Sequence, residues 1–288
     1  MQTKVCTPKG ITLISILLGL GAALTWGAAD FGGGFASKRM NSYSVVIGSH
    51  IISMATFIVL AILLNEPIPP MRDWLIGTAA GLAGGTGLML LYRALAEGKM
   101  SVAAPVSAVV AAAIPVFVAS LTQGLPAILT FLGFALASTA VWLLSSGEAT
   151  TQIRIKDLGL PLTAGVAFGL FFVLLHQASG GAIVWPIIAT RIGSIGGLLA
   201  YTSLTRKSWI PPRGQWSLLT FVGIIDATGT ACYALSAQLG RLDTAAVISS
   251  LYPGATVLLA WVFLKEKISR IQAIGVILAL GEIILLTL

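Results

Sequence analysis

Residues 43–64 read YSVVIGSHIISMATFIVLAILL, and this run contains no Asp, Glu, Lys or Arg. A helix of about 20 apolar residues is long enough to cross the hydrocarbon core of a bilayer. The rest of the chain has the same character, because 57% of the 288 residues are hydrophobic and only 9% are charged. Soluble domains contain about 25% charged residues. The sequence therefore predicts an integral membrane protein.

Ten stretches of similar length follow one another along the chain, separated by polar breaks such as Asn65–Arg72 and Ser145–Asp157. They cover residues 11–31, 43–64, 73–95, 101–121, 124–144, 157–177, 183–204, 214–236, 243–264 and 269–288. Within lipid, only helices and closed barrels satisfy all backbone polar groups, and these runs are too long and too uniformly apolar for barrel strands. We expect an all-α membrane protein with ten transmembrane helices.

An internal repeat appears when residues are compared at a constant offset of 142. Residues 98–104 (GKMSVAA) then align with residues 240–246 (GRLDTAA), and Trp26-Gly27 aligns with Phe168-Gly169. Each repeat contains five spans, and an odd number of spans places the second repeat upside down in the membrane. We predict two inverted five-helix repeats, residues 1–146 and 147–288. Secondary transporters often have this plan, with a midplane substrate site and alternating access by rocking of one half against the other.

The segment from Leu251-Tyr252-Pro253 through residues 263–269 (FLKEKIS) to Gly275, together with residues 24–27 (LTWG), resembles the EamA branch of the drug/metabolite transporter superfamily. The resemblance covers both halves. It implies a ten-helix exporter of small metabolites such as amino acids or of drug-like compounds, with a cavity lined by spans 1, 3, 4, 6, 8 and 9 or their neighbours. The first half departs from the pattern, because Gln123-Gly124 occupies the place of Lys265-Glu266.

Three ionisable residues lie well inside the predicted spans, where a charge is costly and often functional. Asp226 is a candidate for proton coupling or for binding a substrate amine, and the alternative is a structural hydrogen bond to a neighbouring helix. Arg191 and His50 occupy roughly matching places in spans 7 and 2. Each is a candidate to bind an anionic substrate group or to pair with a backbone carbonyl.

Other candidates come from aromatic residues and from helix-breaking residues. Trp26, Tyr92, Tyr233 and Tyr252 are candidates to stack on an aromatic or cationic ligand. Pro253, beside Ser249 and Ser250, is expected to kink span 9, as Pro105 and Pro115 are expected to kink span 4. Gly77, Gly81 and Gly85 recur every four residues and predict close helix packing. The polar residues nearer to span ends are expected to reach the interface; they are Asp30, Arg93, His176 and Glu282.

The distribution of positive charge predicts an orientation. Loops after odd-numbered spans carry most of the Lys and Arg residues, including Arg39, Arg154, Arg206 and Lys265. The positive-inside rule therefore places these loops in the cytoplasm and both termini outside. Members of the resembled family usually have cytoplasmic termini. The expected location is the inner or plasma membrane.

Several function classes find no support in the sequence. The net charge of +7 is scattered between spans and forms no basic face for nucleic acid. No HExxH zinc motif and no phosphate-binding glycine loop is present, so we expect no enzyme activity, no metal and no cofactor. The expected partners are a small-molecule substrate and membrane lipid, with possible proton coupling, and the oligomeric state stays open. The alternatives to a transporter are a lipid or lipid-carrier flippase and a non-transporting sensor or partner subunit.

Overall fold

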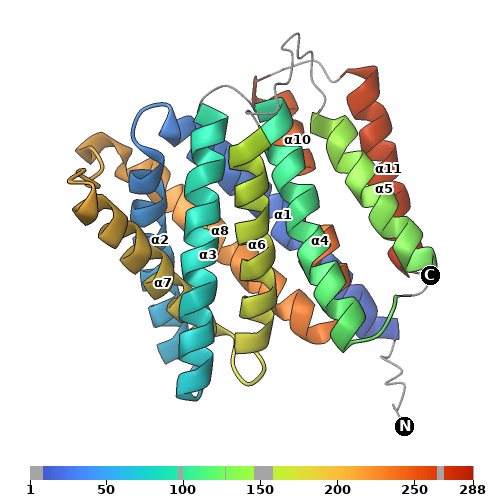
Figure 1. Cartoon of the computed structure of the whole chain (residues 1–288), viewed down its shortest axis with the longest axis horizontal. Helices are drawn as coiled ribbons and strands as arrows, with labels where there is room; N and C mark the ends of the chain where they lie inside the picture. The colour runs from blue at the N-terminus through green and yellow to red at the C-terminus, as the bar shows by residue number, and fades with distance from the viewer. Residues whose placement is uncertain (1–8, 97–99, 127, 146–157, 265–268, 288) are drawn as a thin grey trace.

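The computed structural model describes residues 9–96, 100–126, 128–145, 158–264 and 269–287. These residues form α-helices joined by short loops, with one 3-10 turn at Arg213–Gln215 (Figure 1). The helices are α1 (Lys9–Ser37), α2 (Ser42–Leu64), α3 (Met71–Ala96), α4 (Met100–Thr122), α5 (Ile128–Ser145), α6 (Gly159–Ala178), α7 (Val184–Leu204), α8 (Trp216–Leu239), α9 (Leu242–Ser249), α10 (Tyr252–Leu264) and α11 (Arg270–Thr287). The prediction of an all-α protein is confirmed.

The helices follow the predicted spans closely. Seven of them, α1, α2, α3, α4, α6, α7 and α8, are both long enough and apolar enough to cross a membrane within the described residues. Large apolar side chains such as Leu63, Leu121 and Leu204 point outward and are exposed. In a membrane this surface faces lipid. The motif Lys265–Ile268 and the repeat residues Gly98 and Lys99 lie outside the described residues.

Span 9 is two helices rather than one. Helix α9 ends at Ser249 and α10 begins at Tyr252. Pro253 has no N–H to donate to the carbonyl of Ser249, and Leu251 instead donates to the carbonyl of Ile248 in a tighter turn, at 3.1 Å. The kink predicted at Pro253 is therefore a complete break. In contrast, α4 continues through Pro105 and Pro115 without interruption.

The packing of the helices shows a two-fold relation between the halves of the chain. Helix α1 packs against α8, and its counterpart α6 packs against α3, the counterpart of α8. In the same way, α2 packs on α8 as α7 packs on α3, and α1 packs on α9 and α10 as α6 packs on α4. Helices α5 and α11 pack on each other at one edge of the molecule (Figure 1). The pattern is that of a duplicated, inverted pair.

These contacts create two bundles that each mix helices from both halves. We call α1, α2, α8, α9 and α10 the α1 bundle, and α3, α4, α6 and α7 the α6 bundle. They meet mainly where α2 packs on α7 and where α4 packs on α9. The bundles, rather than the two sequence repeats, are the closely packed units of the molecule.

Glycines allow the close approach inside each bundle. A Cβ atom on Gly81 of α3 would collide with the carbonyl oxygen of Thr190 on α7. At the equivalent position, a Cβ atom on Gly223 of α8 would collide with the carbonyl oxygen of Ser49 on α2. The glycine spacing in span 3 thus predicted close packing correctly, and the repeat preserves this contact in both bundles.

Two buried tyrosines repeat the same relation. Tyr92 of α3 donates a hydrogen bond to the carbonyl of Ala29 on α1, at 3.4 Å. Tyr233 of α8 donates to the carbonyl of Phe172 on α6, at 3.0 Å. Each bond joins the first and third helices of one repeat and also joins the two bundles. These tyrosines therefore hold the bundles together on either side of the space between them.

One loop also ties the first repeat to the second. The carboxylate of Glu66, after α2, accepts hydrogen bonds from the backbone N–H groups of Ile183, Val184 and Trp185 at 2.8 to 3.2 Å. The first N–H groups of a helix have no partner within that helix, and its N-terminus favours negative charge. Glu66 therefore caps α7 and fixes its first turn.

Candidate functional site

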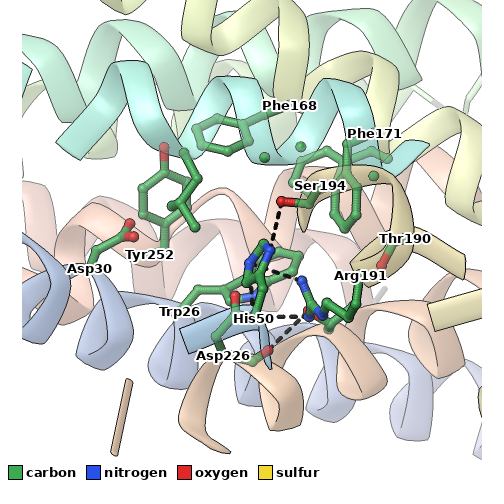
Figure 2. Close-up of a pocket in the computed structure, with 16 residues that line it drawn as sticks. Trp26, Asp30, His50, Phe168, Phe171, Thr190, Arg191, Ser194, Asp226 and Tyr252 are labelled. Carbon is green, nitrogen blue, oxygen red and sulfur yellow. Dashed lines mark hydrogen bonds and ion pairs between the residues drawn. The ribbon is translucent and has the colours of Figure 1, made fainter. Parts of the chain in front are cut away.

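A cavity lies between the two bundles. It has a volume of about 570 Å³, counting the space open to solvent. Its lining comes from α1, α2, α3, α6, α7, α8 and α10, and the residues include Trp26, Asp30, His50, Gly84, Phe168, Phe171, Phe172, Arg191, Ser194, Asp226, Thr230 and Tyr252. Most of this surface is apolar, and the polar groups gather at two places (Figure 2).

The first polar group centres on an ion pair between α7 and α8. Arg191 Nη2 lies 2.9 Å from Asp226 Oδ2. The same nitrogen donates to the hydroxyl of Thr230 at 2.7 Å, and Thr230 donates to the backbone carbonyl of Asp226 at 2.9 Å. Arg191 and Asp226 are both buried. The guanidinium and the carboxylate therefore neutralise each other beside the cavity.

His50 extends this group to α2. Arg191 Nη1 lies 3.1 Å from His50 Nε2, and His50 Nδ1 lies 2.7 Å from the hydroxyl of Ser194. A guanidinium can only donate, so Nε2 must accept and the ring proton belongs on Nδ1, from which it is donated to Ser194. The arrangement fixes a neutral imidazole. The matching places of His50 and Arg191 in the repeat thus become a direct contact across the two-fold axis (Figure 2).

One donor of the group remains unused. The Nε–H of Arg191 is buried and has no hydrogen-bond partner within the described residues. A buried unsatisfied donor costs free energy, typically about 1–3 kcal/mol. A ligand with an acceptor oxygen could remove that cost.

Aromatic rings form one wall of the cavity. Trp26 stacks on Phe172 with ring centroids 5.6 Å apart, and Phe171 meets Trp26 edge-on at 6.4 Å. Tyr233 lies behind them, fully buried, and stacks on Phe172 at 4.6 Å. Trp26 therefore lines the cavity, while Tyr233 supports the wall without lining it.

The second polar place is Asp30, and here the sequence interpretation is wrong. Asp30 was expected to reach the interface from the end of span 1, but α1 continues to Ser37. The side chain is instead 8% exposed and lines the cavity beside Tyr252 (Figure 2). The extra helical turns place Asp30 inside the membrane-spanning part of α1.

The other predicted residues separate into two sets. Asp226, Arg191, His50, Trp26 and Tyr252 line one cavity. Tyr252 also shares a hydrogen bond of 3.1 Å with Ser107 of α4. Tyr92 and Tyr233 do not line the cavity, and their hydroxyls donate to backbone carbonyls of α1 and α6. Ser249 is buried with its hydroxyl 3.5 Å from the carbonyl of Gly19, and Pro253 lies in the first turn of α10.

The remaining residues near span ends differ from Asp30. Arg93 is exposed and His176 is partly buried, in keeping with positions close to helix ends. The side chain of Glu282 lies outside the described residues.

Sequence reasoning missed several lining residues. Ser194 and Thr230 gave no signal, because hydroxyl residues are common in membrane helices. Phe168 could have been found, since the repeat aligns it with Trp26 and both rings line the cavity. The same comparison shows that Asp226 aligns with Gly84 and Asp30 with Phe172. Both carboxylates thus belong to the α1 bundle, and the cavity is chemically asymmetric.

Comparisons with known proteins agree with this architecture. The sequence model of the EamA-like transporter family matches residues 13–146 and 157–288. No protein of curated function matches the chain. One solved protein structure, described only as the crystal structure of a protein, superposes with a TM-score of 0.76 over 94% of this chain and 95% of its own. At 16% identity, it shows a common fold alone. The two matched segments cover nearly the whole chain, which therefore belongs to the EamA-like transporter family, a family of membrane transporters and not of enzymes.

Proposed function

We propose that this transporter is a secondary exporter of small metabolites or drug-like compounds and that the cavity between the bundles is its substrate site. The observation that carries the proposal is the Arg191–Asp226 pair, 2.9 Å apart and buried beside an open space within the membrane-spanning helices. Charged groups are costly at this depth and are retained mainly where they serve transport. The aromatic wall opposite provides a surface for the apolar part of a substrate.

Alternating access then requires the two bundles to move relative to each other. The sequence suggested that one repeat rocks against the other. Packing favours the mixed bundles as the moving units, because the repeats interleave and the cavity lies between the bundles. The contacts between the bundles would break and form again in turn at the two faces of the membrane.

Some of the hydrogen bonds between the bundles lie at one face, the face where α1 begins (Figure 1). Arg241, before α9, donates to the carbonyls of Gln123 and Gly124 after α4, at 3.3 and 2.9 Å. Gln238 of α8 donates to the carbonyl of His176 on α6, at 2.9 Å. We propose that these contacts form the closed gate in this conformation.

Asp226 is the proposed coupling residue. A substrate oxygen that approaches the unused Nε–H of Arg191 would compete with Asp226 for the guanidinium. A carboxylate released from its cation can take up a proton, so substrate binding and proton binding become linked at one pair of side chains. This linkage makes a proton gradient a suitable driving force.

The test is transport in proteoliposomes, with labelled amino acids, nucleosides and organic cations offered with and without a pH gradient. Saturable, selective uptake that responds to the gradient is expected for the unaltered protein. Asp226→Asn should remove the response to the gradient while the protein remains folded. A well-folded protein that moved none of these compounds but moved a fluorescent lipid between leaflets would instead be a flippase.

Location and orientation are part of the same proposal. We place the protein in the inner or plasma membrane, with the basic loops after odd-numbered spans in the cytoplasm, because positive charge is retained on that side. Lys207 and Gly180 lie in loops at opposite faces of the molecule, so each position can be replaced by a single cysteine to test the orientation. In intact cells, an impermeant maleimide should label Gly180→Cys and not Lys207→Cys, and the reverse pattern would place both termini in the cytoplasm.

A further inference from the structure

Asp30 differs from every other charged group that lines the cavity. Its side chain is 8% exposed, and within the described residues no Lys, Arg or His forms an ion pair with it. The side chains of Asp226, Tyr92 and Tyr252 are close enough to interact with it, and none of them carries a positive charge. Asp30 thus faces the cavity without a cation.

The other charges of the cavity are already balanced. Arg191 is paired with Asp226 at 2.9 Å, and His50 is held neutral between Arg191 and Ser194. Among the lining residues, Asp30 is therefore the one carboxyl group without a cationic partner. With its carboxylates ionised, the empty cavity has a net charge of minus one.

Hydrogen bonding cannot make up for the missing cation. The Tyr92 hydroxyl has a single proton and donates it to the carbonyl of Ala29, at 3.4 Å. A proton given to Ala29 is not available to Asp30. A buried carboxylate with incomplete hydrogen bonding and no counter-ion is strongly disfavoured, and a positive group bound in the cavity would supply what is missing.

The surroundings of Asp30 suit an organic cation rather than a bare metal ion. Tyr252 lies beside the carboxylate, and Trp26 and Phe168 line the space next to it (Figure 2). Ring faces attract ammonium groups and also pack against an apolar body. A metal ion would need several oxygen ligands, whereas these neighbours are mostly rings.

We propose that Asp30 is the binding site for a positively charged group and that the substrates of this protein are organic cations with an aromatic or apolar body. The proposal rests on the transport function argued above and narrows its substrate class. In the bound state, the cation lies between Asp30 and the ring of Tyr252. The apolar part of the substrate extends along Trp26.

The experiment measures binding apart from transport. Purified protein in detergent is titrated with radiolabelled benzyltrimethylammonium and tetraphenylphosphonium, and with phenylacetate and benzyl alcohol as anionic and neutral aromatic probes. We expect saturable binding of a cation and weaker binding of the other two probes. Asp30→Asn should weaken cation binding by at least about tenfold, as expected for the loss of one charged contact, and Asp30→Glu should restore part of it.

Asp73→Asn is the matched control. Asp73 is also a buried carboxylate, 7% exposed in the first turn of α3, but it does not line the cavity. Its substitution should leave cation binding unchanged, which separates the role of Asp30 from a general effect of removing an acid. Thermal unfolding of each variant confirms that the protein is folded.

The outcomes separate this proposal from the transport function. Equal cation binding by Asp30→Asn and the unaltered protein, or preferential binding of phenylacetate or benzyl alcohol, would overturn the role of Asp30. Binding of neither cation would overturn it as well, even if proteoliposomes transport another compound. Cation binding that depends on Asp30, without flux in proteoliposomes, would leave the site intact and remove the transport proposal.

Discussion

At the scale of single residues, the Arg191–Asp226 pair joins helices of different bundles, and the contact of Arg191 with His50 joins the two repeats. Arg191 belongs to α7 and Asp226 to α8, while His50 comes from α2 in the other repeat. Asp226 aligns with Gly84 in the first repeat, so the carboxylate occurs once. The helices therefore follow a two-fold pattern, but the site does not. It contains the cation Arg191, the carboxylate of Asp226 that is paired with it, and the separate carboxyl group of Asp30.

The pair should also contribute to stability, and its two members should be strongly coupled. Arg191→Gln or Asp226→Asn alone leaves one buried charge without its partner, which costs about 3–5 kcal/mol in comparable pairs. The double substitution removes both charges, so its loss of thermal stability should be smaller than the sum of the single losses. Melting temperatures of the four proteins in detergent measure this. Additive losses would show that the two side chains do not interact.

At the scale of helices, the sequence predicted the spans well because the length and apolar content of a membrane helix are local properties. It also located the break before Pro253, since a missing N–H is local too. It misjudged Asp30, because span 1 was predicted to end at residue 31, whereas the helix continues through residues 31–37 (FGGGFAS). Contacts between helices, such as Arg191 with Asp226, depend on tertiary packing and could not be predicted.

Arg241 joins the start of α9 to the end of α4, which belong to different bundles. Its removal should weaken the contact between the bundles at the proposed gate. Arg241→Ala loses the bonds to the carbonyls of Gln123 and Gly124, each worth about 1 kcal/mol. Together they amount to about 2 kcal/mol, so the conformation open at that face should become more populated by roughly thirtyfold. In a protein without native cysteines, a cysteine at the lining residue Leu88 should then react faster with a maleimide applied to that face.

The control for Arg241 is Lys207→Ala. Lys207 lies in the loop after α7 and donates to the hydroxyl of Tyr201 in the last turn of the same helix, at 3.3 Å, so it does not join the bundles. Its substitution should leave the labelling rate at Leu88→Cys unchanged. An equal rate in the Arg241 variant would mean that its hydrogen bonds do not hold the gate closed.

At the scale of the whole molecule, the order of helices along the chain and their arrangement in space divide the protein differently. Along the chain there are two repeats, yet the closest packing joins α1 to α8 and α3 to α6, which belong to different repeats. Rocking of one repeat against the other would have to break these contacts, including the glycine-mediated ones. Movement of the mixed bundles keeps them and changes the contacts between the bundles, beside the cavity and at the proposed gate.

Crosslinks can decide between the two descriptions. Ser15 of α1 and Ser236 of α8 have hydroxyl oxygens 3.3 Å apart, so Ser15→Cys with Ser236→Cys should form a disulfide that joins the two repeats within one bundle. Ala112 of α4 and Val247 of α9 share an apolar cluster, so cysteines there would join the two bundles. Both variants are made in a protein in which Cys6 and Cys232 are replaced. Oxidation should stop transport by the variant with cysteines at Ala112 and Val247. Oxidation should leave transport unchanged in the variant with cysteines at Ser15 and Ser236. Loss of transport on oxidation of the Ser15–Ser236 pair alone would make the repeats the moving units, because that disulfide leaves the interface between the bundles free.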